Sequence, residues 1–276
     1  MSECGMRNTA RPIAFILAST NHGTLIVNRN DYRMIDESRG FGVGFQLLNT
    51  SNFDPTEVEL ECALLLKRRQ YFGDGVVAVD CGANIGVRTI EWARLMHDWG
   101  SVFSFEAQEK IFYALAGNVA INNCLNVVAR NVAVGDKCAT LQIPEPNYLT
   151  PSSYGSFELI KRDTTEFIGQ MIDYNKTREI PLISIDSLNF GRLDYMKIDV
   201  EGMEEAVLAG AMETLARCKP ILLVENIKSN KESLSSTFVK LGYKPFDIGI
   251  NTLAFHTADP TIKHLSVTGN SLNFST

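Results

Sequence analysis

Residues 76–86 read Val-Val-Ala-Val-Asp-Cys-Gly-Ala-Asn-Ile-Gly. The run Val76–Asp80 is continuously apolar and ends in an acid, which predicts a parallel strand buried on both faces. The glycines at 82 and 86 let the backbone turn tightly, and a helix is expected to follow at Val87–His97. A helix N-terminus offers free N–H groups and the positive end of its dipole. This strand–turn–helix unit therefore predicts a ligand site at its turn.

Strand-like and helix-like segments alternate along the rest of the chain, which is typical of a parallel sheet with crossover helices. We expect seven strands, at Val76–Asp80, Val102–Glu106, Val127–Ala133, Tyr195–Asp199, Ile221–Glu225, Lys244–Ile248 and Thr252–His256. We expect helices on both faces of this sheet, at Val87–His97, Glu109–Asn122, Met203–Arg217 and Lys231–Leu241. Only Gly249–Asn251 separate the last two strands, so these should form an antiparallel hairpin and make the sheet mixed.

Residues 1–53 are interpreted as a β-hairpin extension that acts as a lid or flap. Two strand-like runs, Ile13–Ser19 and Thr24–Asn28, flank a short link that contains a glycine, which is a hairpin signal. A helix should begin at Asp54, because an N-cap side chain is followed there by a proline and then by a glutamate three residues after the cap. The main domain is therefore expected to span residues 54–276.

The segment between Pro144 and Pro181 interrupts the regular alternation. Polar and turn residues accumulate in it, and the helical and strand periodicities weaken. A connection this long in a compact domain is usually a functional insertion. We expect the insertion, at about residues 144–181, to face the substrate.

Composition excludes several classes of protein. A chain of 276 residues can bury one large core, and its net charge of −6 argues against a basic surface for nucleic acid. The longest early apolar run, Ile13–Ala18, is too short for a bilayer span or a signal-peptide core, so we predict a cytoplasmic protein with no membrane partner. The six cysteines form no CxxC pair and the four histidines have no metal-ligand spacing, so no zinc site is predicted.

Two further strand ends add to the ligand site. Glu106 ends the second predicted strand, where a carboxylate can accept hydrogen bonds from both hydroxyls of a ribose. The third predicted strand closes with Asn131–Asp136, which offers an apolar shelf and a polar edge for adenine. The glycine spacing is not that of a dinucleotide fingerprint, and no Gly-Lys-Ser/Thr phosphate loop follows it. A structural glycine turn and a solvated acid at Glu106 are the alternatives.

These motifs together resemble the FkbM-type family of S-adenosylmethionine-dependent methyltransferases. The resemblance covers about Glu57–Glu225, and its most specific part is Lys-Ile-Asp-Val-Glu-Gly-x-Glu at residues 197–204. It implies a class I, Rossmann-like, seven-stranded sheet, S-adenosylmethionine as methyl donor, and O-methylation of a sugar or natural-product hydroxyl. The partner would be a small-molecule or glycan acceptor. Two departures stand out: Ala107-Gln108 replaces the usual proline after the ribose acid, and the first 50 residues match nothing assigned.

We expect the cofactor to lie along the glycine loop, residues 80–86, and along the neighbouring strand ends. Its predicted contacts are Asp80, Gly82, Asn84, Gly86, Glu106, Asn131, Val134 and Asp199. At Gly82 in particular, a side chain should occupy space that the cofactor needs.

Acids also gather where the chemistry is expected. Asp80, Glu106, Asp199 and Glu225 all end predicted strands, and open α/β sheets bind ligands outside the carboxyl ends of their strands. Buried carboxylates are costly unless they meet a cation, a sulfonium or hydrogen-bond donors. Methyl transfer needs an aligned acceptor that loses its proton, so we predict catalytic roles near the acceptor for Asp199, Glu201 and Glu225.

A metal-dependent version is the alternative for these acids. Asp199 with Glu225-Asn226 is similar to the oxygen ligands that hold Mg²⁺ in catechol-type O-methyltransferases, with glutamate in place of the second aspartate. Without a metal, Glu225 would hydrogen-bond nearby backbone or cofactor. Two rival functions also stay open. One is an NAD- or nucleotide-binding oxidoreductase on a similar sheet, which the glycine spacing disfavours, and the other is a non-catalytic binding module.

Overall fold

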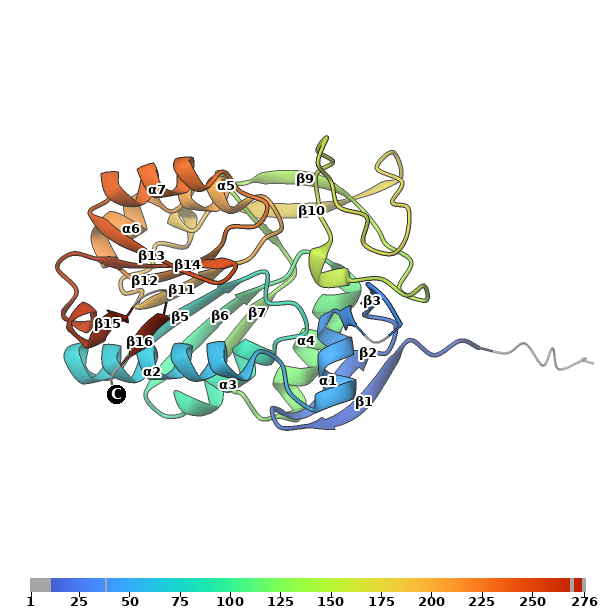
Figure 1. Ribbon diagram of the computed structural model, residues 1–276, viewed down its shortest axis with the longest axis horizontal. Coiled ribbons are helices and arrows are strands. Elements are labelled where there is room, and N and C mark those ends of the chain that lie inside the picture. Colours follow the sequence, from blue (N-terminus) through green and yellow to red (C-terminus); the bar gives the residue numbers. More distant parts are fainter. Residues whose placement is uncertain (1–10, 38, 269–270, 275–276) are drawn as a thin grey trace, which may run out of the picture.

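The computed structural model describes residues 11–37, 39–268 and 271–274. Its centre is a seven-stranded sheet in the order β13-β14-β12-β11-β5-β6-β7 (Figure 1). The strands are β5 (Val76–Cys81), β6 (Gly100–Phe105), β7 (Val127–Arg130), β11 (Tyr195–Ile198), β12 (Ile221–Glu225), β13 (Tyr243–Ile248) and β14 (Asn251–His256). Because β14 runs antiparallel to both of its neighbours, the sheet is mixed. This confirms the predicted fold class.

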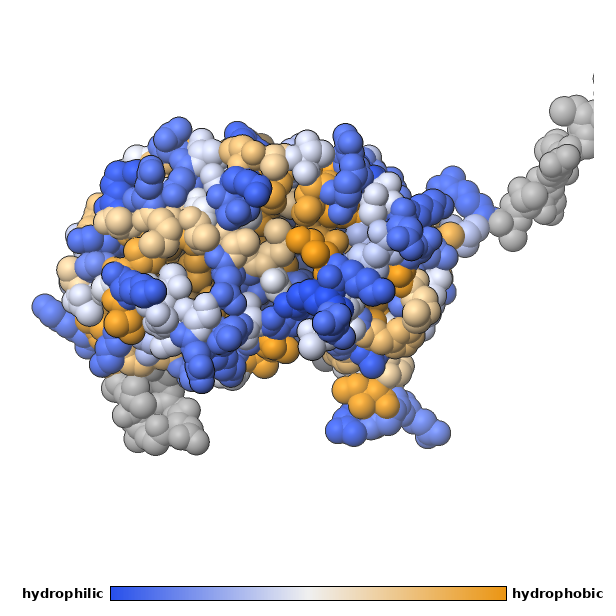
Figure 2. Space-filling view, turned by 90° about the horizontal axis from the view of Figure 1, so that it is seen from above, coloured by the Kyte–Doolittle hydropathy of each residue, from blue (hydrophilic) through white to orange (hydrophobic). Residues whose placement is uncertain are grey.

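Helices cover both faces of the sheet, which makes three layers (Figure 1). One face carries α2 (Pro55–Phe72), α3 (Val87–Leu95) and α4 (Glu109–Ile121). The other face carries α5 (Glu204–Ala209), α6 (Met212–Cys218) and α7 (Lys231–Lys240). Alternate residues of each strand point to opposite faces of the sheet. Ala78 and Tyr195 pack in the core under α2 and α3, whereas Val79 and Met196 pack in the core under α5–α7. On the side that carries α5 and α7, hydrophilic and hydrophobic residues are interspersed (Figure 2).

Two predicted elements are each divided in the structure. The helix expected at Met203–Arg217 is interrupted between α5 and α6 by Gly210, which packs so closely that a Cβ there would overlap the carbonyl oxygen of Gly135. The strand expected at Val127–Ala133 ends with β7, and the chain then forms β8 (Ala133–Val134), which leaves the main sheet to pair with β10. In both places a tertiary contact overrides the local pattern.

The N-terminal extension contains the predicted hairpin, formed by β1 (Phe15–Thr20) and β2 (Gly23–Asn28). It continues through β3 (Arg33–Met34), β4 (Gly40–Phe41) and α1 (Val43–Thr50). Leu25 and Val27 of β2 are fully buried in the core, and the Asn118 side chain of α4 donates to the carbonyl oxygen of Ile26 at 3.2 Å. The hairpin is therefore packed against α4, and its action as a flap stays a prediction.

The expected insertion belongs to a second, smaller sheet. Its strands are β8, β10 (Thr177–Ile183) and β9 (Ala139–Pro144), and η1 (Tyr154–Ser156) lies in the loop between β9 and β10. Phe157, Ile168 and Ile180 form a separate apolar cluster beneath it. A bridge between Asp31 and Ser152 joins this loop to the N-terminal extension. The insertion and the extension thus meet at one edge of the molecule.

The remaining short elements are η2 (Asp186–Leu188), η3 (Pro260–His264) and the hairpin β15 (Leu265–Thr268) and β16 (Ser271–Phe274). Among the described residues, no helix is both long and apolar enough to cross a membrane. The described cysteines carry no disulfide and are Cys62, Cys81, Cys124, Cys138 and Cys218.

Candidate active site

A cavity of about 520 Å³ opens at the carboxyl ends of β5, β6, β11 and β12. The glycine loop and the loops after β6, β11 and β12 form one part of its wall, and residues of the extension and the insertion form the rest. A volume of this size is ordinary for a cofactor or small-molecule site. The cavity therefore lies where the strand ends predicted it.

The glycine loop presents a buried acid to this cavity. Thr89 donates its hydroxyl to Asp80 Oδ2 at 2.7 Å, while Asp80 Oδ1 is buried with no hydrogen-bond partner among the described residues. Burial raises the pKa of Asp80. A buried, unpartnered carboxylate oxygen calls for a donor, and an ammonium group of a ligand would supply one.

Gly82 is required for a different reason from the one expected. Its φ is +82°, and a Cβ at this position would overlap the backbone carbonyl oxygen of Asp199. The expectation that a side chain would fill cofactor space is therefore corrected, because the protein's own backbone occupies that position. Gly86 also has positive φ, and a Cβ there would press against Leu115 of α4. Both glycines let neighbouring segments approach closely.

Glu106 is held at the edge of the cavity by backbone donors. Its carboxylate accepts the N–H groups of Asn84 at 2.9 Å and Gln108 at 2.8 Å, and the residue is 5% exposed. Burial raises its pKa to about 7, although the two N–H groups partly offset this effect. Each carboxylate oxygen has a further lone pair for a ligand hydroxyl.

Asn131 and Val134 take different positions around this acid. The Asn131 amide donates to the carbonyl oxygens of Glu106 at 2.8 Å and Ala107 at 3.1 Å, so it supports the loop that carries Glu106. Val134 lines the cavity, together with Asn84 from the glycine loop. At the site of the departure from the family pattern, the Gln108 side chain donates to the carbonyl oxygen of Tyr154 at 2.9 Å and ties this loop to the insertion.

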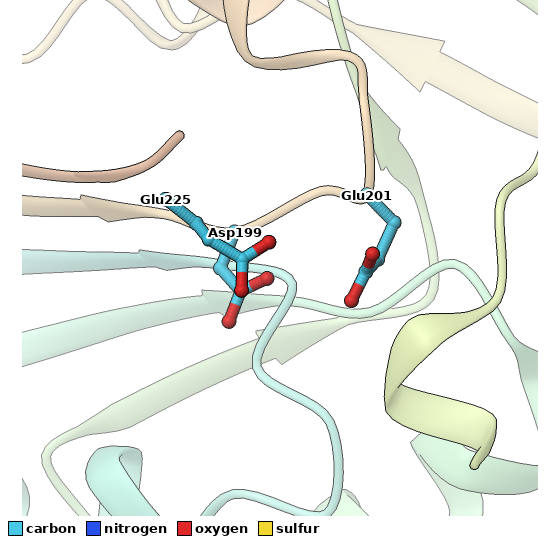
Figure 3. Close-up of side chains that lie close together, drawn as sticks. All are labelled: Asp199, Glu201 and Glu225. Atoms are coloured by element: carbon cyan, nitrogen blue, oxygen red, sulfur yellow. The ribbon is translucent and has the colours of Figure 1, made fainter. Parts of the chain in front are cut away.

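Three predicted acids come together at one side of the cavity (Figure 3). Asp199 follows β11, Glu201 lies in the next turn and Glu225 ends β12; one carboxylate oxygen of each lies within 4.8 Å of the others. Lys197 Nζ is 2.7 Å from Asp199 Oδ2, as expected for a lysine that pairs with an acid, and Lys228 Nζ is 2.5 Å from Glu201 Oε2. Within the described residues, no hydrogen bond or ion pair engages the Glu225 carboxylate.

The electrostatics of this cluster favour proton uptake. Burial raises the pKa of Glu225, and the charges of Asp199 and Glu201 raise it further. Burial and Asp199 also raise the pKa of Glu201, against the opposing effect of Lys228. These two carboxyl groups hold a proton more tightly than ordinary ones, so at neutral pH the protonated group donates a hydrogen bond within the cluster.

Glu204 keeps the turn that carries Glu201 in place. Its Oε1 accepts the N–H groups of Val200 at 3.2 Å and Gly202 at 2.9 Å, and its Oε2 accepts the hydroxyl of Ser229. Glu201 itself adopts φ +55° in this turn. The Glu204 carboxylate thus holds the turn that carries Glu201 in place at the cavity.

Asn226 does not join the cluster as the metal-dependent version requires. Its amide donates to Thr252 Oγ1 at 2.8 Å, and the residue is 2% exposed and absent from the described lining of the cavity. Thr252 belongs to β14, which pairs with β12. Of the predicted metal ligands, the structure brings Asp199 and Glu225 together, and the third acid of their cluster is Glu201.

Sequence reasoning missed several residues of the cavity. The buried Arg88 was not identified, and neither were the aromatic residues Phe41 and Phe53. Lys228, which pairs with Glu201 but is not among the described residues that line the cavity, was also not identified. Lys228 lies three residues after Glu225, so a cation near a predicted acidic strand end was the available signal. No local pattern marks the two phenylalanines, which are brought to the cavity by the folding of the extension.

Residues 80–244 match the model of the Methyltransferase FkbM domain, which is more than half of the chain. The chain belongs to the FkbM family of methyltransferases. The family resemblance and the dependence on S-adenosylmethionine that it implies are thereby supported over the oxidoreductase alternative. No curated protein matches the chain.

Several solved structures are similar to this FkbM-family chain at low identity. The FkbM methyltransferase from Methylobacillus flagellatus matches with 16% identity and a TM-score of 0.48, over 67% of this chain and 46% of that one. An rRNA methylase from Streptococcus thermophilus matches with 9% identity and a TM-score of 0.41, over 71% and 93%. M. jannaschii TYW2 in complex with AdoMet matches with 11% identity and a TM-score of 0.40, over 89% and 85%. The chain spans less than half the length of the first of these structures.

Proposed function

We propose that this FkbM-family enzyme transfers a methyl group from S-adenosylmethionine to a hydroxyl group of a sugar or natural-product acceptor. The observation that carries the proposal is the cluster of Asp199, Glu201 and Glu225, which lines the same cavity as the glycine loop. A hydroxyl is a poor nucleophile until its proton leaves, and a carboxylate of this cluster is placed to receive it. The acceptor is a small molecule or a glycan, and the acidic lining argues against nucleic acid.

The cavity residues fit the cofactor. Asp80 Oδ1 has no partner and would hold the ammonium group, Glu106 would accept the ribose hydroxyls, and Val134 would face the adenine. When bound, S-adenosylmethionine supplies a methyl group activated by its sulfonium. The chain itself would align the methyl donor and the acceptor hydroxyl, which bind in two parts of the same cavity.

Cofactor affinity should increase as the pH rises through about 7, where Glu106 ionises. Ribose hydroxyls donate to the ionised carboxylate, so binding at pH 6 requires the minor, ionised form and should be about tenfold weaker than at pH 8. Calorimetric titration of S-adenosylmethionine at the two pH values measures this. Glu106→Gln should bind more weakly and with a smaller pH dependence. An affinity independent of pH in the wild type would contradict the role of Glu106.

On the acceptor side, Lys197 and the acids have different roles. Lys197 is buried, and its ammonium group lies 2.7 Å from Asp199 Oδ2, which holds the Asp199 side chain at the cavity. Glu225 has no cation partner among the described residues, and its raised pKa means that it holds a proton at neutral pH and can donate a hydrogen bond. Asp199 would align the hydroxyl and receive its proton. Lys228 holds Glu201 at the side of this pair.

A divalent cation does not fit this cluster well. The ammonium groups of Lys197 and Lys228 already contact Asp199 and Glu201, and a bound cation would be repelled by both of them. Asn226, which a metal site would use, donates its amide nitrogen to Thr252 and is not among the described residues that line the cavity. The acids of the cluster therefore act without a bound divalent cation.

Turnover should accordingly be insensitive to chelators. EDTA at millimolar concentration, followed by dialysis into metal-free buffer, should leave the methyl-transfer rate within about twofold of the untreated value. Asn226→Ala should show the same insensitivity. Loss of activity on chelation and its recovery with Mg²⁺ would contradict the metal-free arrangement and restore the alternative.

The function itself is tested with an unbiased acceptor screen. Purified protein and methyl-labelled S-adenosylmethionine are incubated with an extract of the source cells, and labelled products are isolated and identified by NMR. A label on a hydroxyl oxygen of a sugar or natural product is the expected result. A label on nitrogen or carbon, or no transfer at all, would overturn the proposal.

A further inference from the structure

Part of the cavity wall lies outside the region matched by the family model, which begins at residue 80. From the N-terminal side the cavity is lined by Phe41, Val43, Gln46, Phe53, Asp54 and Glu57. We name these six lining residues the acceptor wall. Cofactor binding and proton transfer use residues inside the family region, so a wall outside it is free to match the acceptor of this particular enzyme.

We propose that the acceptor wall determines which acceptor this enzyme methylates, with Phe53 as its specificity-determining residue and His22 as the residue that positions Phe53. The proposal rests on the proposed function, since it assigns the selectivity of that same site. The acceptor class that it implies has an apolar ring face and carries no phosphate or carboxylate group.

The position of Phe53 is set by a buried histidine. His22 lies in the turn between β1 and β2, is 4% exposed, and its Nε2 accepts the N–H of Phe53 at 2.9 Å. Nδ1 of the same ring is 2.9 Å from Glu91 Oε1 of α3. Because Nε2 is the acceptor, Nδ1 carries the hydrogen and donates to Glu91. The hairpin turn thereby links Phe53 to the helix that follows the glycine loop.

The other end of the wall is anchored as firmly. Asp31 is buried, and its carboxylate accepts the N–H of Gly44 at 3.1 Å and the N–H of Tyr154 at 3.0 Å. Its carbonyl oxygen also accepts the N–H of Phe45 at 2.9 Å. These contacts tie the start of α1 to the insertion across the cavity rim. The wall is thus held at both ends and presents a preformed surface to the acceptor.

The chemistry of the wall indicates the charge of the acceptor. Among the described residues, the cations at this wall are paired. Arg88 is 2.7 Å from Glu57, 3.3 Å from Asp54 and 2.9 Å from Glu61, so three carboxylates neutralise it. Arg33, whose guanidinium lies 5.6 Å from the centre of the Phe41 ring, is 2.8 Å from Glu166. An anionic group on the acceptor would meet these acids without a free cation to receive it. The rings of Phe41 and Phe53 offer apolar faces instead. An uncharged acceptor with a ring face fits these residues.

The test compares wall variants in the labelled extract screen, with the full-length protein and with each labelled product separated on an anion exchanger. The wild-type product should pass through uncharged. Phe53→Ala and His22→Ala should each raise the KM for that acceptor at least tenfold, change kcat by less than threefold and leave the Kd for S-adenosylmethionine within twofold. Phe53→Tyr, which keeps the ring, should stay near wild type. Leu48→Ala, on the exposed side of α1, is the matched control and should change nothing.

The outcomes separate this inference from the proposed function. If wild type labels nitrogen or carbon and the wall variants still raise the KM, the hydroxyl assignment is wrong and the wall inference stands. If wild type labels a hydroxyl and Phe53→Ala leaves the KM within twofold or lowers only kcat, the wall inference is overturned. It is also overturned if the product binds the anion exchanger, or if the wall variants lose cofactor affinity. No transfer by the wild type overturns both.

Discussion

Asp199→Asn should lower the turnover number by about 10²–10⁴-fold while the affinity for S-adenosylmethionine stays near the wild-type value. Asparagine keeps the shape of the side chain, but it cannot take up a proton and leaves Lys197 without its ion-pair partner. The backbone carbonyl oxygen of Asp199, which packs against Gly82, is unchanged by the substitution. The expected loss therefore falls on the acceptor chemistry alone.

Single-turnover kinetics, calorimetry and thermal denaturation on the same preparations measure this prediction. Asp194→Asn is the structural control, because Asp194 is a buried acid just before β11 that pairs with Arg68 and Arg192 outside the cavity lining. That variant should lose thermal stability and keep its turnover per folded molecule. If Asp199→Asn instead behaves like this control, Asp199 is a structural acid and Glu201 or Glu225 carries the proton transfer.

Gly82→Ala should abolish measurable cofactor binding and turnover and should also lower the melting temperature. Two effects act together: an alanine is strained at φ +82°, and its Cβ would overlap the carbonyl oxygen of Asp199. To remove the overlap, either the glycine loop or the turn after β11 must shift. The first movement misplaces the cofactor, and the second misplaces the acid cluster.

Gly73→Ala separates strain from overlap. Gly73 has φ +74° and ψ −177°, a conformation that side chains rarely adopt, and a Cβ there would meet no atom within 4 Å, so its substitution carries only the conformational strain, of about 1–3 kcal/mol. Thermal denaturation and calorimetric titration of both variants give the comparison. The Gly82 variant should lose far more stability than the Gly73 variant, which should bind the cofactor normally. Equal losses in the two proteins would show that the contact with Asp199 is unimportant.

The main sheet could be predicted from the sequence because its strands are marked locally. Continuous apolar runs that end in acids mark β5 and β12, and the glycines after β5 mark the turn into α3. The carboxyl ends of parallel strands meet at one edge of a sheet, so Asp80, Asp199 and Glu225 could be expected at a common site. Pattern, chain order and this rule are enough to place the cavity.

Contacts between distant segments could not be predicted in this way. The division of the expected helix by Gly210 depends on the carbonyl oxygen of Gly135, and the role of Gly82 depends on the carbonyl oxygen of Asp199. The engagement of Asn226 by Thr252 is set by the pairing of β12 with β14. In each case the neighbour that decides the outcome is remote in sequence.

By itself, the sequence determined the fold class, the glycine loop and the acids that end the strands, because these follow from short-range periodicity and from the backbone freedom of glycine. Only the tertiary structure decided which cations pair with the acids of the cavity and which residues of the extension line it. Lys228 reaches Glu201, and His22 anchors Phe53, through side-chain contacts that local pattern does not specify. The physical reason is that hydrogen bonds and ion pairs depend on distances between folded elements, which periodicity within one segment does not specify.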